Sequence, residues 1–257
     1  IMNKVEHQQR TISRSDPHGA QLLKKKMHSL KSQEKRLEKT ELTQLPDVEE
    51  SINFFFGNVQ IPKNKTILDL YIPKLEVDNK TLATNIELKI TGNAHLCIIG
   101  NNGSGKTTLI KRIYEELKNR TDIKVGYMPQ NYDDILSAYE RVLDFASPSK
   151  SKDDITKTRT LLGNMNFTKD EMTGSISYLS NGSKAKLFLV YLVLSNCDVL
   201  ILDEPTRNVS PLSNPVIRNV LSNYKGTIIS ISHDRKYIEE VIDTLYILDK
   251  TGLKKVL

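Results

Sequence analysis

Cysteine and tryptophan are scarce in this chain of 257 residues, which contains two cysteines and no tryptophan. Cys97 and Cys197 each lie in an apolar, strand-like run. That setting favours small core residues and argues against a disulfide framework or a cysteine metal site. Chains that do not use disulfides are typical of reducing compartments, so we expect a cytoplasmic protein.

Long apolar runs are also missing. No stretch reaches the roughly 18 consecutive apolar residues that a membrane-spanning helix needs. Residues 1–7 lack the apolar segment of a secretory signal peptide. We therefore expect no transmembrane segment and no signal peptide. Because the chain begins at Ile1 rather than at methionine, we hypothesise that it is a fragment of a longer protein.

Positive charge is concentrated at one end of the chain. Residues 1–45 carry ten lysines and arginines against five acidic residues, a net charge of +5 out of a total of +6. A basic arm on a near-neutral body indicates an anionic partner for the arm. The stretch 44–47, which contains Pro46, predicts a boundary between a basic helical linker segment (1–45) and a globular domain (46–257).

Residues 21–39 have the pattern of a basic helix. Leu23, Leu30 and Leu37 repeat every seven residues, and basic residues fill many of the other positions. This narrow apolar seam suits one arm of a helical hairpin whose partner lies outside the chain. A solvated charged helix is the alternative.

The clearest motif is the glycine-rich stretch of residues 100–108. It stands between an apolar run, 96–99, and a segment, 109–117, with apolar residues at helical spacing. The order of strand, glycine loop and helix lets backbone N–H groups and the positive end of the helix surround phosphate oxygens. Lys106 adds a full charge, and Thr107 is placed to bind Mg²⁺. The predicted phosphate-binding residues are Gly100, Asn101, Asn102, Gly103, Ser104, Gly105, Lys106, Thr107 and Thr108.

Short strands and helices follow one another through the rest of the globular domain. We expect a strand over residues 124–128, mainly helices over 133–172, and alternating strands and helices afterwards. This order predicts an α/β fold. The strands expected to form an antiparallel sheet ahead of the phosphate loop are residues 52–56, 66–72, 74–77 and 86–90.

Residues 199–204 predict a buried strand that ends in two carboxylates. Four apolar residues precede Asp203 and Glu204. A continuous apolar run suits a strand buried on both faces, and in open α/β sheets ligands bind at the carboxyl ends of such strands. We expect Asp203 to hold Mg²⁺ through its water shell and Glu204 to orient or deprotonate the attacking water.

A second anion-binding device lies upstream of those carboxylates. Ser180 and Gly182 belong to the stretch 179–183, directly ahead of an apolar helix predicted over 184–194. A serine and a glycine at a helix N-terminus can bind phosphate. One γ-phosphate does not need two loops of one subunit, so we interpret this loop as half of a composite site that another subunit or domain completes. A simple helix cap at Ser180 is the alternative.

A further buried strand is predicted over residues 227–232, and His233 follows it. A lone histidine after a strand is usually structural. Here the strand is expected to deliver His233 to the same sheet edge as Glu204, close enough to hydrogen-bond a γ-phosphate.

In this order the motifs resemble those of the ABC ATPases, and the resemblance covers about residues 50–257. The matching motifs are a Walker A loop from Gly100 to Thr107, a Q-loop at Gln130, a signature over 179–183, a Walker B pair at Asp203 and Glu204, a D-loop around 208–211 and a switch histidine, His233.

The resemblance implies a P-loop NTPase of ABC type, with a RecA-like core, an antiparallel β subdomain and a helical subdomain that carries the signature. It implies ATP and Mg²⁺ as cofactors. Gln130 would act as a metal ligand and also join Glu204 and His233 in catalysis. It further implies a head-to-tail dimer with two ATP molecules between the two ATPase domains.

Within this superfamily, residues 203–206 and 232–238 are similar to the ABC-F branch, whose members carry two ATPase domains on one chain and no transmembrane partner. Residues 207–215 resemble ABC-F proteins that protect ribosomes from antibiotics. The basic helix is similar to the second half of that branch's interdomain linker. On this resemblance, the chain is a C-terminal ATPase domain plus part of the linker, and the ribosome with its RNA is a partner.

Two other functions stay open at this point. One is the cytosolic ATP-binding subunit of a membrane ABC transporter, which would co-purify with an integral membrane protein. The other is a nonhydrolysing structural or chromosome-associated ABC protein, which would show ATP-dependent DNA binding.

Overall fold

The computed structural model describes residues 59, 61–147, 149, 151–207, 209 and 214–257. The predicted basic helix, the domain boundary near residue 46 and the expected strand 52–56 lie outside the described residues. Residues 208 and 210–211 of the expected D-loop lie outside them as well.

A long antiparallel hairpin precedes the phosphate loop, which confirms the antiparallel sheet predicted there. β1 (Thr66–Val77) pairs with β2 (Lys80–Thr91). The two turn residues between them, Asp78 and Asn79, both have positive φ. A two-residue type I′ turn requires this geometry, and it suits the twist of the flanking strands.

One detail of that prediction is wrong. Residues 66–72 and 74–77 form the single strand β1 rather than two strands. Pro73 lies between them and cannot donate a backbone hydrogen bond. Because β1 has only β2 as a hydrogen-bonded neighbour, one of its edges is unpaired within the described sheet, and an edge strand tolerates a proline.

The main sheet of the described residues has six strands in the order β4-β5-β6-β3-β7-β8. The first five are parallel, and β8 is antiparallel to β7. Every residue of β5 and β6 is buried, as expected for strands covered on both faces. The strands are β3 (His95–Ile99), β4 (Val125–Met128), β5 (Val199–Asp203), β6 (Thr227–Ile231), β7 (Thr244–Asp249) and β8 (Gly252–Lys255).

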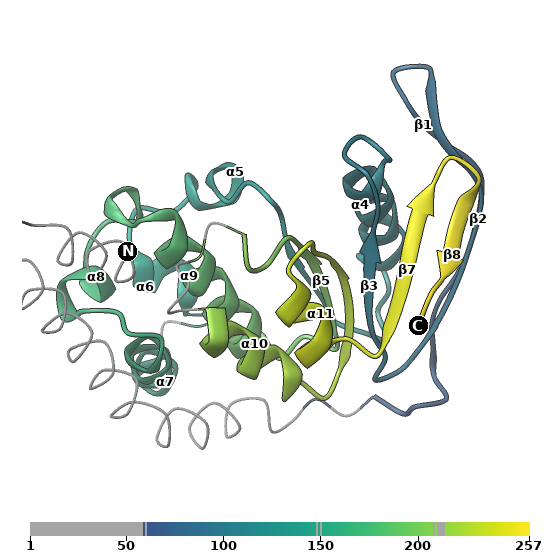
Figure 1. The fold of residues 1–257 in the computed structure, drawn as a ribbon. Coiled ribbons are helices and arrows are strands. Elements are labelled where there is room, and N and C mark those ends of the chain that lie inside the picture. Colours follow the sequence, from purple (N-terminus) through teal and green to yellow (C-terminus); the bar gives the residue numbers. More distant parts are fainter. Residues whose placement is uncertain (1–58, 60, 148, 150, 208, 210–213) are drawn as a thin grey trace, which may run out of the picture. The chain divides into compact units, whose positions relative to one another are not determined.

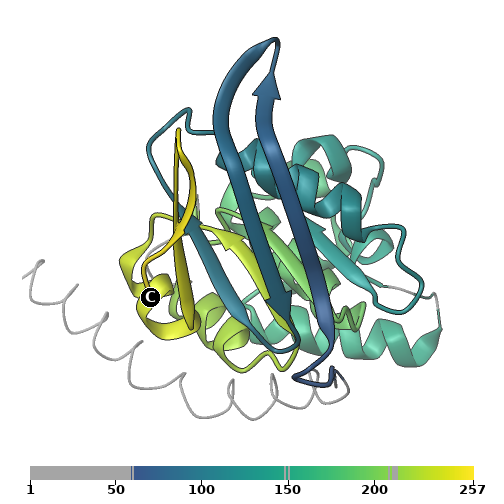
Figure 2. The ribbon, with the colours of Figure 1, turned by 90° about the vertical axis from the view of Figure 1, so that its right-hand side faces the viewer.

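The largest part of the core lies where the hairpin, α4 (Lys106–Leu117) and the main sheet meet. Ile110 and Ile113 of α4 are fully buried and belong to one cluster with Ile86 of β2 and Ile201 of β5. Figure 1 shows α4 beside β3, and Figure 2 shows the hairpin crossing in front of the main sheet. The helix that begins at the phosphate loop is therefore held from two sides.

A group of helices connects β4 to β5, as predicted for residues 133–172. α9 is the most buried of them, and its buried residues include Phe188 and Val190. Figure 1 shows this helical part at the end of the domain away from the hairpin. Its elements are α5 (Asp133–Leu136), α6 (Val142–Ala146), α7 (Lys152–Asn164), α8 (Lys169–Thr173), the 3₁₀ helix η1 (Ile176–Tyr178) and α9 (Asn181–Leu194). Two later helices, α10 (Asn214–Ser222) and α11 (Arg235–Val241), flank β6 in the chain.

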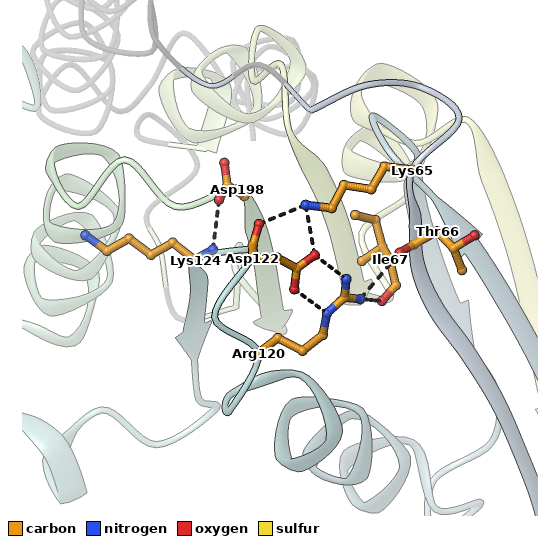
Figure 3. A network of polar contacts seen from close by, with 7 residues as sticks. All are labelled: Lys65, Thr66, Ile67, Arg120, Asp122, Lys124 and Asp198. Atoms are coloured by element: carbon orange, nitrogen blue, oxygen red, sulfur yellow. Dashed lines mark hydrogen bonds and ion pairs between the residues drawn. The ribbon is translucent and has the colours of Figure 1, made fainter.

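A polar network fixes the start of the hairpin to the loop between α4 and β4 (Figure 3). The guanidinium of Arg120 donates to both carboxylate oxygens of Asp122 and to the carbonyl of Ile67. The ammonium of Lys65 lies 2.9 Å from the same carboxylate. These two cations hold the pKa of Asp122 well below its ordinary value. The network thus joins the start of β1 to a loop about 55 residues later in the chain.

Two expectations about burial and membranes can be compared with this fold. Cys97 and Cys197 are both buried and unoxidised, which confirms their place in the core. Within the described part of the chain, no helix combines the length and the apolar character that a membrane span requires.

Candidate functional site

The phosphate loop directly follows β3, at the carboxyl end of the parallel strands. Gly100 approaches the backbone closely, because a side chain there would lie 2.5 Å from the carbonyl oxygen of Leu248. Gly105 has a φ of +97°, and a side chain there would lie 3.1 Å from Leu75 and Leu82 of the hairpin. These two positions require glycine, which lets the loop pack closely against β7 on one side and the hairpin on the other.

The exposed side of the loop leaves room for a ligand. Asn101, Asn102 and Gly103 are exposed, while Ser104, Thr107 and Thr108 are half-buried. The N–H of Ser104 donates to the carbonyl of Asn101 at 3.1 Å, which closes the turn. No side chain of the described residues caps the start of α4. The first N–H groups of that helix therefore remain available to an anion.

Lys106 is folded over the loop. Its side chain is 9% exposed, and its ammonium donates to the carbonyls of Gly100 at 2.8 Å and Asn101 at 3.0 Å. Burial lowers the pKa of Lys106, and the nearby carboxylates of Glu204 and Asp203 oppose that change. A charged group already desolvated beside the loop can exchange these carbonyls for phosphate oxygens.

Asp203 ends β5 and is 1% exposed. Neither of its carboxylate oxygens accepts a hydrogen bond within the described residues. Burial raises the pKa of Asp203, and the Thr107 hydroxyl and the cations Lys111 and Lys106 offset part of the rise. The Thr107 hydroxyl therefore lies near the carboxylate without completing a hydrogen bond.

These oxygens fit a magnesium ion. Buried carboxylate oxygens without partners are unusual, since an unpaired buried charge is unfavourable. The described residues contain no group of three or more histidine, cysteine or acidic side chains that could hold a metal by themselves. Mg²⁺ prefers one or two protein oxygens together with water and substrate phosphates. Asp203 and the Thr107 hydroxyl are of this kind.

Glu204 has an uncommon backbone conformation directly after β5. Its φ is +57°, and its N–H donates to the carbonyl of Ile231 at 2.9 Å. Non-glycine residues in this region carry strain, and such strain gathers at functional positions. The side chain is 13% exposed. Burial raises the pKa of Glu204, and His233 opposes the rise.

His233 lies where the sequence predicted it. It follows β6, and its Nε2 atom lies 3.8 Å from a carboxylate oxygen of Glu204. The imidazole is about half exposed, so it can face both Glu204 and a ligand. β5 and β6 are paired neighbours, and their carboxyl ends bring these two residues together.

Gln130 reaches the same edge from a third strand. It stands two residues beyond β4, which pairs in parallel with β5. Its side chain is exposed. Gln130, Asp203, Glu204 and His233 therefore follow three adjacent strands, at the edge where the phosphate loop leaves β3.

Ser180 and Gly182 lie elsewhere, at the start of α9 in the helical part of the domain (Figure 1). The Ser180 hydroxyl accepts a hydrogen bond from the N–H of Ser183 at 3.1 Å. Ser180 therefore caps α9, as the alternative interpretation expected. Ser180 is also exposed and Gly182 is half-buried, which leaves the start of this helix open to solvent.

Two residues that were not selected from the sequence, Arg207 and Lys111, influence the carboxylates, and a third, Tyr127, is influenced by Asp203. Arg207 lowers the pKa of both Asp203 and Glu204, and Lys111 lowers that of Asp203. Lys111 could have been found from sequence, because it lies one helical turn after Thr107. The buried hydroxyl of Tyr127 has no hydrogen-bond partner among the described residues, and both burial and Asp203 raise its pKa to about 12. The position of Tyr127 near Asp203 depends on the pairing of β4 with β5, which cannot be read from the sequence alone.

Comparison with known proteins agrees with this geometry. A family model described as ABC transporter matches residues 83–207, which include the phosphate loop and both carboxylates. The chain contains an ABC ATPase domain. The solved dimeric structure of the ATP-binding cassette MJ0796, bound to ADP and Pi, matches with a TM-score of 0.61 at 16% identity, over 75% of this chain and 98% of that one. At such an identity the likeness concerns the fold, and it confirms the expected fold class.

Relatives of this ABC ATPase domain occur in bacteria and plants. YdiF of Bacillus subtilis is 31% identical over 88% of this chain and 36% of its own length. The ribosome protection protein VmlR of Bacillus subtilis is 29% identical over 89% of this chain and 43% of its own length. ABC transporter F family member 2 of Arabidopsis thaliana is 29% identical over 68% of this chain and 27% of its own. The chain thus spans less than half the length of these relatives.

Proposed function

We propose that this ABC ATPase domain binds ATP with Mg²⁺ and hydrolyses it to ADP and phosphate. The observation that carries the proposal is the convergence of four groups at one sheet edge. Lys106 covers the phosphate loop, Asp203 presents two buried oxygens without a hydrogen-bond partner in the described part of the chain, and Glu204 lies 3.8 Å from His233. This set can bind a triphosphate, hold a metal and position water.

In the proposed reaction, water attacks the γ-phosphorus in line with the bond to the β-phosphate. A P–O bond to the water oxygen forms, the γ–β bridging bond breaks, and ADP leaves. Glu204 orients the water and receives its proton, for which its raised pKa is suited. Lys106 and His233 stabilise charge on the phosphate oxygens. Thr107, Asp203 and Gln130 would hold Mg²⁺, which would supply further positive charge.

We further propose that each site is composite, with Ser180 and Gly182 closing over nucleotide held by a second ABC ATPase domain. That domain is either another copy of this chain or a second ATPase domain of a longer chain. Two observations support this view. The start of α9 is open to solvent, and it lies on a different part of the domain from the phosphate loop. The matching MJ0796 structure is dimeric.

Substitution of Glu204 tests the chemistry. Glu204→Gln should keep ATP binding and abolish turnover, because an amide cannot accept the proton, and the closed pair of domains should accumulate. Lys106→Ala should instead weaken nucleotide binding itself. Phosphate release and nucleotide affinity measured on both variants decide the assignment, and unchanged turnover in Glu204→Gln would refute it.

For the biological role, we propose an ABC-F factor that acts on ribosomes, in antibiotic resistance or translation, in the cytoplasm. The support is the similarity to VmlR, a ribosome protection protein, over 89% of this chain, and to an F family member of a plant. The basic residues of 1–45 supply charge for contacts to RNA phosphates. The ATP-binding subunit of a membrane transporter is the second candidate, since the matching family model is described as ABC transporter.

Co-sedimentation with ribosomes across a salt series separates these roles. An RNA-contacting factor should pellet with ribosomes in ATP, and its binding should weaken steeply as salt rises. A transporter subunit should stay in the supernatant and instead co-purify with an integral membrane protein. Deletion of residues 1–45 should weaken the ribosome interaction and leave nucleotide binding intact.

A further inference from the structure

The most exposed large apolar side chain among the described residues is Tyr178, which is 91% exposed. It belongs to the 3₁₀ helix η1 and stands two residues ahead of Ser180. Tyrosine carries a large apolar ring with a polar hydroxyl at its tip, and such rings are enriched at interfaces, where a partner covers the ring.

The turn that carries Tyr178 is well fixed. Its neighbours Ile176 and Leu179 are 4% and 7% exposed and anchor the turn in the helical part of the domain. The N–H of Tyr178 donates to the carbonyl of Ser175 at 3.2 Å, and the N–H of Leu179 donates to the carbonyl of Ile176 at 3.1 Å. Tyr178 and Ser180 are both exposed and stand on either side of the buried Leu179, whose backbone is extended. Because alternate residues of an extended segment lie on the same side, we place the ring of Tyr178 on the same side as Ser180.

Other exposed tyrosines in the described part of the chain have partners of their own. Tyr139 is 42% exposed and packs edge-on against Phe145, with ring centroids 5.2 Å apart. The hydroxyl of Tyr71, 58% exposed, lies 3.5 Å from the amide oxygen of Asn85. Tyr178 is therefore the exposed ring whose position calls most for a covering group.

We propose that Tyr178 contacts the base of the nucleotide held by the second ABC ATPase domain. The inference rests on the composite site proposed above. If Ser180 faces the γ-phosphate of that nucleotide, a ring two residues away on the same exposed side lies within reach of the same ligand, since two residues span at most about 7 Å. Flat aromatic rings stack on bases, and stacking accepts any base because every base has a π face.

The hairpin of the second domain supplies a surface on the other side of the base. Leu75 and Leu82 lie directly against Gly105 of the phosphate loop, so the hairpin end is next to the bound triphosphate. Val77, two residues beyond Leu75, is 40% exposed. If the base is held between an aliphatic residue of one domain and Tyr178 of the other, pairing of the two domains should require the nucleoside as well as the phosphates.

The experiment follows ligand-dependent pairing of the full chain by sedimentation velocity in the Glu204→Gln background, where turnover does not interfere. Two ligands are titrated with Mg²⁺, namely ATP and inorganic tripolyphosphate, which lacks the nucleoside. Tyr178→Ala should raise the midpoint concentration of ATP about tenfold, equivalent to about 1.4 kcal/mol, and leave that of tripolyphosphate unchanged. Tyr178→Phe should retain the ATP midpoint, and Tyr139→Ala is the matched control that should shift neither.

The outcomes separate the inference from the proposed function. Equal shifts for both ligands would mean that Tyr178 contacts protein rather than base, and no shift would mean that it contacts neither; either result overturns the inference alone. Ser180→Ala should shift both ligands, because it removes a phosphate contact. If ATP drives no pairing of the unsubstituted Tyr178 chain, or if Ser180→Ala has no effect, a composite site between two copies of this chain fails and the inference fails with it.

Discussion

Two adjacent acidic residues, Asp203 and Glu204, show that the candidate site works against the stability of its own fold. Burial raises the pKa of both. A carboxylate whose folded pKa is raised destabilises the native state when it is ionised, because the unfolded chain solvates it better. Asp203 has no hydrogen-bond partner within the described residues to compensate. Retention of such a group is understandable if a cation binds there.

We therefore expect Asp203→Asn to stabilise the domain while it abolishes hydrolysis. Removing a buried charge should raise the thermal midpoint, measured without nucleotide, by at least about 2 °C, the shift expected for a change near 1 kcal/mol in a domain of this size. Asp69→Asn is the matched control, since Asp69 is 70% exposed and its ion pair with Lys89 spans 3.6 Å. A lower midpoint for Asp203→Asn would mean that the carboxylate has a structural partner.

The same two residues predict a pH dependence. Between the ordinary carboxyl pKa and the raised folded value, the native state binds more protons than the unfolded state, so stability rises as the pH falls through that window. The expected slope of unfolding free energy against pH, measured by urea titration below neutrality, is negative for the natural sequence and shallower for Asp203→Asn. Equal slopes for the two proteins would show that Asp203 does not titrate in this window.

At the scale of the element, α9 illustrates how the helical part is held together. Phe188 of α9 is 1% exposed, and its ring lies 5.0 Å from Phe145 and 5.5 Å from Tyr132, between centroids. Tyr132 follows Gln130 by two residues, so this aromatic cluster links α9 to the segment that carries Gln130. Four residues earlier on α9, Lys184 forms an ion pair with Asp133 at 2.7 Å.

These two contacts of α9 should differ greatly in strength. Phe188→Ala is expected to lower the unfolding free energy by about 3–5 kcal/mol, because it leaves a cavity among packed rings. Lys184→Ala should cost less than about 1 kcal/mol, since the aspartate of its ion pair is 65% exposed. Urea unfolding of both variants makes the comparison on one helix. Equal losses would show that the ion pair stabilises α9 as strongly as the aromatic cluster does.

The elements that the sequence predicted well are those whose pattern is local. The loop after β3, the buried strand ending at Asp203 and the capped start of α9 each follow from a short stretch of residues. The continuity of β1 across Pro73 was missed, because it depends on the strand being at an edge. The buried hydroxyl of Tyr127 near Asp203 was missed for a related reason, since strand order and register bring it there. The motifs of the site were thus predictable from the sequence, whereas the side chains that surround them were less so.

At the scale of the whole molecule, the two buried cysteines connect nucleotide binding to stability. Cys97 lies on β3, three residues before the phosphate loop, and Cys197 lies just ahead of β5. Burial raises the pKa of each thiol to about 11. Because the thiolate is the reactive form, both should be inert in the folded domain and should react only when the domain opens.

ATP with Mg²⁺ should therefore slow the reaction of both thiols with a thiol reagent. A ligand that binds only the native state stabilises it by about 2.7 kcal/mol at a concentration of 100 times its dissociation constant, which lowers the open population about a hundredfold. Labelling followed by mass spectrometry of the peptides that contain Cys97 and Cys197 measures this protection at each position. Lys106→Ala should remove the protection in the same range of ATP concentration without faster labelling in the absence of nucleotide. Protection of Cys97 alone would indicate that nucleotide tightens only the β3 region, and that the main sheet does not open as one unit.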